Sequence, residues 1–196
     1  MLHRAALCLL IAALPLAACS RRQPPAEATP EIATRDTAAE RRDRERLEQM
    51  RRDSIAAADR AAREAAEREI TARATSVLEE MVFFDYDISE LRPDAQTALG
   101  RKVPILRANP NLRLEIAGHA DERGSLEYNL ALGMRRAQSV KDYLAGFGID
   151  AARLTITSYG EDRPLDEGSG EDAWARNRRA EFVITAGGSP LTLPGS

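Results

Sequence analysis

The sequence predicts an α+β domain in which helices cover one small sheet, with a long charged helix in front of it. After Met81, four short apolar runs alternate with stretches of helical spacing, and elements in this order pack as two layers. Before Met81, residues 31–80 are rich in Arg, Asp, Glu and Ala and contain no proline. At 196 residues the chain has room for one ordinary domain plus such a segment. We therefore expect a domain at residues 81–186 and a helical spacer at residues 31–80.

The charged segment at 31–80 has the pattern of a solvated helix. Pairs such as Glu64 with Arg68 and Asp59 with Arg63 have the i to i+4 spacing that supports an exposed helix. Its few large apolar residues do not sustain a heptad repeat. At ~1.5 Å per residue, a helix of about 45 residues reaches on the order of 70 Å. The segment is expected to supply reach, with a weak coiled coil as the alternative.

Four apolar runs in the domain predict strands, at 82–84, 112–116, 154–156 and 180–184. Between them, helical spacing predicts one helix from Pro93 to the stop at Asn109, a second that ends near Gly146 or Gly148, and a short helical turn at 172–176. The glycines and prolines of residues 187–196 predict a disordered tail.

Pro104 conflicts with the first of these helices. An interior proline lacks the N–H donor, and its ring clashes with the carbonyl four residues earlier, here that of Gly100. We therefore expect a kink or a break between Gly100 and Val103.

The first residues have the order of a lipoprotein signal. A basic start, the apolar run Ala5–Leu16 and two small residues precede Cys19, and the run is too short to span a membrane comfortably. The residues up to Cys19 resemble a bacterial lipobox, which implies a signal peptide at 1–18 and acyl chains on Cys19; a plain secretory signal is the alternative. Ser20, where aspartate is the retention signal in enterobacteria, favours the outer membrane. Residues 19–30 are then a lipidated, proline-rich tether.

The charge and the few histidines and cysteines exclude several classes of function. A net charge of -3 gives no reason to expect nucleic acid as a partner. His119, Asp121 and Glu122 lie close together, but His3 and Cys8 fall within the expected signal, so the mature chain lacks the ligands of an ordinary zinc site. It also lacks a nucleophile with a base at a known motif spacing. We therefore expect no enzyme, no metal and no cofactor.

The stretch Gly118–Ala137 offers an acid and a base to one place. It crosses a polar loop with Asp121 and enters a helix with Arg135 and Arg136. If Val140 faces the core, Arg136 lies on nearly the same helix face and Arg135 is rotated away. A buried guanidinium needs a partner or a bound anion, so Asp121 is expected to pair with Arg136 or to share a pocket with it. A purely structural ion pair between loop and helix is the alternative.

The same stretch carries a family resemblance. It resembles the signature of the OmpA-like peptidoglycan-binding domain, and within that family the DERG sequence is most similar to the peptidoglycan-associated lipoproteins. The matching blocks are GHADERG at 118–124, YN at 128–129 and GMRRA at 133–137, with outer blocks at 82–87, 158–160 and 177–179. The match covers about residues 81–186 and implies a mixed four-stranded sheet covered by helices.

By this resemblance, the site holds the diaminopimelate of a peptidoglycan peptide stem. Asp121 is implied to take the ammonium and Arg136 the carboxylate, which suits a carboxylate acceptor and a guanidinium fork. Asn129, with both a donor and an acceptor, matches a position near the ligand. A hydrogen bond at the helix start is its alternative role.

The outer blocks add two further groups to the implied site. Phe84 and Asp85 match the edge of the groove at the first strand. Asn177, Arg178 and Arg179 match a block that either contacts the ligand or braces the site.

The resemblance also implies a role for the whole chain. It describes an outer-membrane lipoprotein, anchored through Cys19 and facing the periplasm, that binds peptidoglycan non-covalently and tethers the membrane to the wall. A Tol-Pal type system, with a TolB-type partner and a part in envelope integrity and cell division, is implied as well. The alternative is a lipoprotein whose charged helix at 31–80 binds another protein, while the domain is only a wall anchor.

Overall fold

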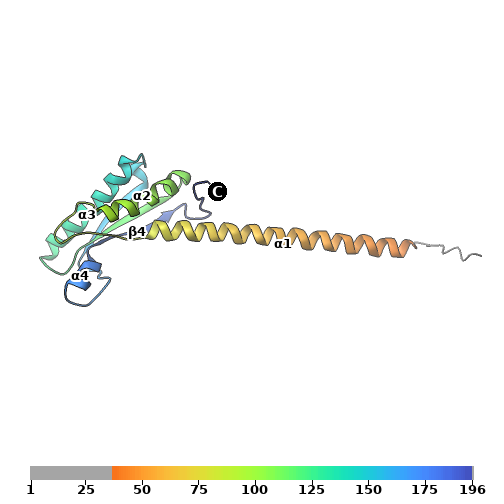
Figure 1. The fold of residues 1–196 in the computed structure, drawn as a ribbon, viewed down its shortest axis with the longest axis horizontal. Coiled ribbons are helices and arrows are strands. Elements are labelled where there is room, and N and C mark those ends of the chain that lie inside the picture. The colour runs from red at the N-terminus through yellow and green to blue at the C-terminus, as the bar shows by residue number, and fades with distance from the viewer. Residues whose placement is uncertain (1–36, 196) are drawn as a thin grey trace, which may run out of the picture. The chain divides into compact units, whose positions relative to one another are not determined.

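The computed structural model describes residues 37–195, so the expected signal peptide, the lipidated Cys19 and the tether lie outside the described residues. The elements, drawn in Figure 1, are α1 (Ala38–Glu79), β1 (Val82–Phe83), α2 (Pro93–Ala108), β2 (Arg113–His119), α3 (Leu126–Gly146), η1 (Ala151–Arg153), β3 (Leu154–Gly160), α4 (Glu171–Asn177) and β4 (Arg179–Ala186). The chain divides into one unit up to Glu48 and a second from Gln49. No helix within the described range 37–195 has the length and apolar character needed to cross a membrane.

The long charged helix is confirmed as α1. Its start is a capping box, because the Thr37 side chain accepts from the Glu40 N–H at 3.3 Å and the Glu40 carboxylate accepts from the Thr37 N–H at 2.9 Å. Most of the helix is exposed, and its first buried residue is Ala74. The helix therefore packs against the domain only near its C-terminal end.

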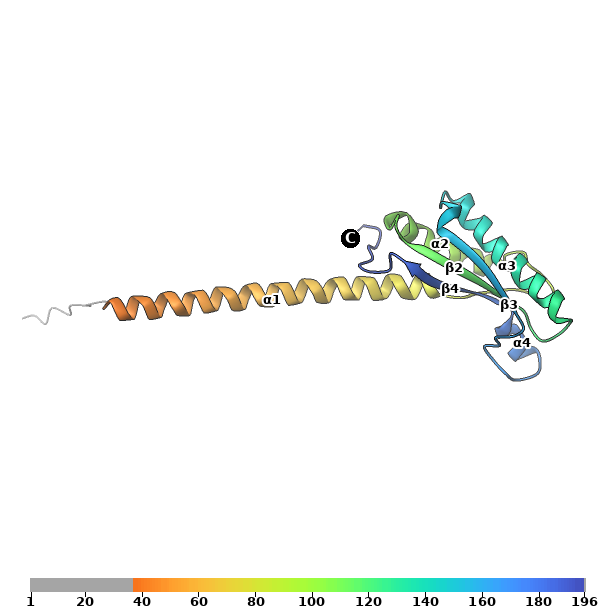
Figure 2. The ribbon, with the colours of Figure 1, turned by 180° about the vertical axis from the view of Figure 1, so that it is seen from behind.

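The four predicted strands form one mixed sheet in the order β1-β4-β2-β3. β2 and β3 run parallel, and β4 lies antiparallel to both β1 and β2. Figure 1 shows α2 and α3 in front of the strands, and the opposite view in Figure 2 shows the strands in front, so both helices cover the same face. The core lies between these layers, as the two-layer prediction requires.

The backbones of β2 and α3 approach each other at two glycines. A Cβ added at Gly118 would lie 1.8 Å from the carbonyl oxygen of Gly133, a distance at which the two elements must separate. Because neither residue has a side chain, α3 lies directly on β2. This contact sets the distance between the end of β2, which leads to Asp121, and the next turn of α3, which carries Arg136.

The predicted break between Gly100 and Val103 is not found, because α2 runs from Pro93 to Ala108 with Pro104 inside it. A proline costs about 3 kcal/mol in a helix interior. Leu99, Val103, Ile105 and Leu106 are all buried around it, and each such side chain contributes ~1.5 to 3 kcal/mol. The apolar face therefore outweighs the local cost.

The last turns of α1 are joined to α2 by a buried lysine. Leu78 and Lys102 are both fully buried. The Lys102 ammonium donates to the carbonyls of Val77, Leu78 and Glu80 at 2.6, 2.9 and 2.7 Å. These carbonyls belong to the C-terminal end of a helix, where they have no intrahelical partner and where a cation is favoured. Lys102 thus caps α1 from a different helix.

The prediction of disorder at 187–196 is wrong for part of this tail. Leu191 is buried at 3% exposure, and its N–H donates to the Thr71 hydroxyl at 3.2 Å. The N–H of Thr192 donates to the side chain of Asn109 at 2.9 Å. The glycines and prolines of this segment predicted disorder, but Leu191 packs in the core and holds the segment against α1.

Candidate functional site

The loop between β2 and α3 forms one wall of a small pocket. The helix start is capped, because the Ser125 hydroxyl accepts from the Tyr128 N–H at 3.3 Å, and Gly124 before it has a φ of 123°. The pocket has a volume of about 120 Å³. It is lined by Tyr86, Asp87, Asp121, Arg123, Gly124, Tyr128, Asn129 and Leu132.

Arg136 is the inward arginine of α3, as predicted, and Arg135 is exposed. The Arg136 guanidinium is completely buried and lies 5.2 Å from the centre of the Phe84 ring. It donates to three main-chain carbonyls, of Ile88 at 2.9 Å, His119 at 2.7 Å and Asp85 at 3.0 Å. Burial lowers the pKa of Arg136 from 12.5 to about 10, so the group stays charged at neutral pH.

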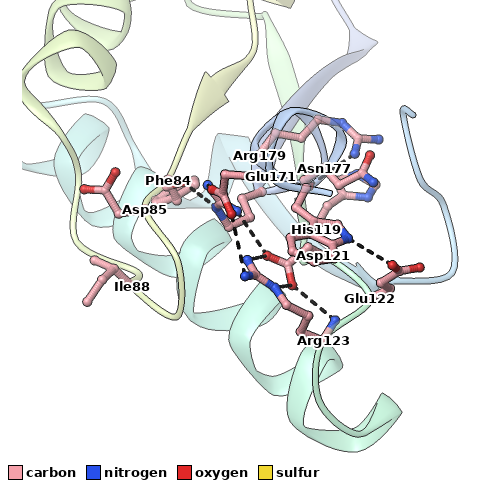
Figure 3. Close-up of polar contacts among 12 residues, drawn as sticks. Phe84, Asp85, Ile88, His119, Asp121, Glu122, Arg123, Glu171, Asn177 and Arg179 are labelled. Atoms are coloured by element: carbon pink, nitrogen blue, oxygen red, sulfur yellow. Dashed lines mark hydrogen bonds and ion pairs between the residues drawn. The ribbon is translucent and has the colours of Figure 1, made fainter. Parts of the chain in front are cut away.

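The predicted direct pair between Asp121 and Arg136 is not formed. Asp121 instead accepts from Arg123, through its N–H at 3.1 Å, its Nε at 3.0 Å and its Nη2 at 2.7 Å. Arg178 completes the set at 3.2 Å. Burial acts to raise the pKa of Asp121, but the hydrogen bonds from Arg123 and Arg178 outweigh it and hold the pKa below the usual value. Figure 3 shows Asp121 and Arg123 facing each other.

Arg123 is held by two aromatic rings as well as by Asp121. Its guanidinium carbon lies 3.9 Å from the centre of the Tyr86 ring and 4.2 Å from that of the Trp174 ring. The Trp174 indole N–H in turn donates to Glu122 at 2.9 Å. Sequence reasoning missed this cluster, although the spacing of Asp121 and Arg123 on one short loop was a usable signal.

Asn129 lines the pocket and also has the structural role given as its alternative. Its side-chain amide donates to the main-chain carbonyl of Asp121 at 3.1 Å and to the carboxylate of Glu161. The amide therefore fixes the main chain at the loop residue whose side chain faces the pocket. Asn129 is itself almost fully buried, at 1% exposure.

Phe84 and Asp85 do not form the groove edge in the way that the resemblance implied. The Phe84 ring belongs to the buried core under Arg136 and is absent from the pocket lining. Asp85 reaches the site through its carbonyl, which accepts from Arg136, whereas its carboxylate lies 3.4 Å from Arg92. The adjacent Tyr86 and Asp87 line the pocket instead.

The block at 177–179 braces the site. The Asn177 side chain accepts from the N–H groups of Leu165 and Asp166, at 2.8 and 3.0 Å, and so fixes the loop before α4. Arg178 joins Asp121 to Glu171, which it contacts at 2.7 Å, and also donates to the Phe84 carbonyl at 3.1 Å.

Arg179 completes this block, because its Nε donates to the Glu181 carboxylate at 2.7 Å and its Nη2 to the Arg163 carbonyl at 3.1 Å. None of the three residues of the block lines the pocket. Of the two roles implied for the block, the contacts favour bracing.

His119 is buried at the end of β2. Among the described residues neither of its ring nitrogens has a hydrogen-bond partner, and Nε2 lies 3.6 Å from the Glu181 carboxylate. Burial, with the nearby charge of Arg179, lowers the pKa of His119 from 6.5 to about 4. Within residues 37–195, no three His, Cys, Asp or Glu side chains are grouped so that they could hold a metal ion.

Comparisons with known proteins agree with this fold. The OmpA family model matches residues 83–178. The chain is 48% identical over 100 residues to the peptidoglycan-associated lipoprotein of Pseudomonas putida, which covers 51% of this chain and 60% of the relative. It is 43% identical over 109 residues to that of Brucella melitensis, which covers 56% and 65%. The chain thus spans less than two thirds of the length of these curated relatives.

A solved structure gives the same result. The crystal structure of the peptidoglycan-associated lipoprotein from Burkholderia pseudomallei is 36% identical and matches with a TM-score of 0.53. The match covers 55% of this chain and 91% of that structure. Through its domain at residues 83–178, the chain therefore belongs to the OmpA family.

Proposed function

We propose that this protein is a non-enzymatic outer-membrane lipoprotein that binds the peptide stems of peptidoglycan and tethers the membrane to the wall. The names of its relatives, which are peptidoglycan-associated lipoproteins at 43–48% identity, support wall binding. Cys19 carries the acyl anchor, and residues 31–80 span the distance between the membrane and the domain. A TolB-type protein of a Tol-Pal system is the proposed protein partner.

The observation that carries the binding proposal is the unpaired charge of Arg136. Among the ion pairs found within residues 37–195, none includes this fully buried guanidinium. A guanidinium has five N–H groups, of which the three main-chain carbonyls use three. A buried cation without a carboxylate partner is costly, and a bound anion relieves that cost. Arg136 itself does not line the pocket, but Leu132, one turn earlier on α3, does. The two remaining N–H groups suit a ligand carboxylate that reaches past this turn.

Asp121 supplies the opposite charge from the loop that precedes α3. Its carboxylate lines the pocket, and its lowered pKa keeps it ionised at neutral pH. An ammonium at Asp121 and a carboxylate at Arg136 together select a zwitterionic group, which is the chemistry of the diaminopimelate side chain. Asn129 is the proposed polar neighbour of this ligand, and the Asp85 carbonyl and Phe84 ring position Arg136 for it.

Sedimentation with purified sacculi tests this function on the full chain. We expect Asp121→Asn and Arg136→Lys each to weaken binding by roughly tenfold or more, since a hydrogen bond to a charged group is typically worth ~1.5 to 3 kcal/mol. Arg107→Ala is the matched control, because this exposed arginine of α2 lies outside the pocket lining. The far-ultraviolet circular dichroism of each variant checks that it is folded. If both folded variants sediment like the wild type, the binding proposal is wrong.

A further inference from the structure

We propose that Arg123 is an internal competitor of the ligand, which occupies the carboxylate of Asp121 until a ligand ammonium displaces it. This inference rests on the proposed function and concerns the same pocket. It makes Arg123 a residue that determines affinity and specificity, although Arg123 makes no lasting bond to the ligand. The hydrogen bonds of Asp121 supply the first step of the argument.

The Asp121 carboxylate has no acceptor site left for an ammonium. A carboxylate offers about four lone-pair positions. Arg123 fills three of them, with its N–H at 3.1 Å, Nε at 3.0 Å and Nη2 at 2.7 Å, and Arg178 fills the fourth at 3.2 Å. The carboxylate is also only 4% exposed. An ammonium can therefore bind Asp121 only where one of these arginines withdraws.

Arg123 is the arginine that can withdraw. Its side chain is 28% exposed, and apart from Asp121 its guanidinium contacts two ring faces and Glu171 at 3.6 Å. The Arg178 side chain is only 7% exposed and also donates to the Phe84 carbonyl and to Glu171. Removing Arg178 would leave a buried carbonyl unpaired, whereas Arg123 can turn into solvent and keep its charge hydrated.

The exchange makes binding selective for cationic stems. When a site is free in only a fraction of the molecules, the apparent affinity of its ligand is the intrinsic affinity multiplied by that fraction. The Asp121–Arg123 bonds therefore weaken the binding of every ligand that needs Asp121. An ammonium regains charge-assisted bonds to the carboxylate that Arg123 leaves. A neutral side chain at the same stem position regains none and therefore does not open the site.

Removing the competitor should strengthen binding. We would measure binding of the tripeptide L-Ala-γ-D-Glu-meso-diaminopimelate to the full chain by calorimetry, for the wild type, Arg123→Ala and the control Arg107→Ala. We expect Arg123→Ala to bind about tenfold more tightly, the gain when a site that is free in about a tenth of molecules becomes free in all. Arg107→Ala should bind like the wild type. Unchanged or weaker binding by folded Arg123→Ala would overturn the inference.

The single tryptophan gives a readout that a structural role of Arg123 would not move. Trp174 is the only tryptophan of the chain, and the Arg123 guanidinium lies on its ring. Titration of the wild type with the same tripeptide should shift the tryptophan emission towards the spectrum of ligand-free Arg123→Ala. The same titration of Arg123→Ala should leave the emission unchanged. If calorimetry shows that the wild type is saturated with tripeptide and its tryptophan emission has not changed, Arg123 is not displaced.

The two proposals can fail separately. If Asp121→Asn and Arg136→Lys retain wild-type binding, the pocket is not the binding site and the proposed function fails. If those variants lose binding but Arg123→Ala gains none, the proposed function stands and the competitor role fails. Each result thus refers to one proposal.

Discussion

Two fully buried cations of this domain, Lys102 and Arg136, look alike and differ in one respect. Each lies against a phenylalanine ring, Lys102 at 4.2 Å from the centre of Phe182 and Arg136 at 5.2 Å from that of Phe84. Each donates to three main-chain carbonyls. Lysine has three N–H groups and arginine has five, so Lys102 is saturated and Arg136 has two N–H groups left.

This difference separates a structural cation from a binding cation. The carbonyls at Lys102 come from one helix end, the C-terminus of α1, which is a favourable place for a positive charge. Those at Arg136 come from the end of β2 and from two positions in the loop after β1. Burial alone therefore does not indicate function; Arg136 combines burial with two spare N–H groups and with no carboxylate partner among the described residues.

The largest effect on stability is expected at Lys102. Lys102→Ala leaves the carbonyls of Val77, Leu78 and Glu80 without their donor and opens a cavity, at a cost of about 3 kcal/mol in the free energy of unfolding. Denaturant unfolding followed by circular dichroism measures it. Sacculus binding by the folded variant should remain at the wild-type level. A loss of binding without a loss of stability would reverse the assignment of the two cations.

Arg136→Lys should have the opposite profile. A lysine ammonium has just enough donors for the three carbonyls and none to spare for a ligand. We expect stability to fall by less than half of the Lys102→Ala value, and affinity for the stem tripeptide to fall by roughly tenfold or more. Unfolding and calorimetry on the same preparation measure both quantities. Wild-type affinity in this variant would show that the two spare N–H groups are not used.

The pH dependence of stability should distinguish the wild type from Lys102→Met. Burial lowers the pKa of Lys102 from 10.5 to about 7. Between these values the unfolded state holds more protons than the folded state, so the free energy of unfolding rises with pH. The slope from one group is at most about 1.4 kcal/mol per pH unit. Unfolding of both proteins from pH 7 to 10 measures it, and parallel profiles would refute it.

The smallest effect is expected one residue away, at Arg101. Its guanidinium contacts both carboxylate oxygens of Glu80 at 2.6 and 2.8 Å, but its side chain is 50% exposed. Exposed ion pairs of this kind are worth ~0.2 to 1 kcal/mol because water and salt screen them. Arg101→Ala should therefore lower stability by less than about 1 kcal/mol. Denaturant unfolding of Arg101→Ala and Lys102→Ala under the same conditions tests this. Equal losses of stability in the two variants would show that local charge, not capping, stabilises the junction.

The sequence predicted the elements and the inward arginine because both follow from local periodicity. Arg136 is buried because it lies four residues before the buried Val140 and so on nearly the same face of the helix. The same rule would have found Lys102, which lies three residues after Leu99 and four before Leu106. What it could not supply is the set of acceptors, which come from the end of α1, 22 to 25 residues earlier.

Of the two arrangements expected for Asp121 and Arg136, the direct pair is not formed, because the partners of Asp121 depend on tertiary structure. Periodicity places an acid and a base at one end of the sheet, but it does not rank several arginines that reach the same place. Arg178 arrives from the residue before β4, 57 positions away. Arg123 lies against the rings of Tyr86, in the loop after β1, and Trp174, in α4. No local pattern brings these five residues together.

The Lys102 junction also has a mechanical consequence. Under the proposed tethering function, tension enters the domain along α1. The three bonds of Lys102 and the buried Leu78 connect the end of α1 to the domain core before the chain continues into β1. The load therefore enters the domain core at this junction, before the chain reaches Asp85 and Ile88, whose carbonyls hold Arg136.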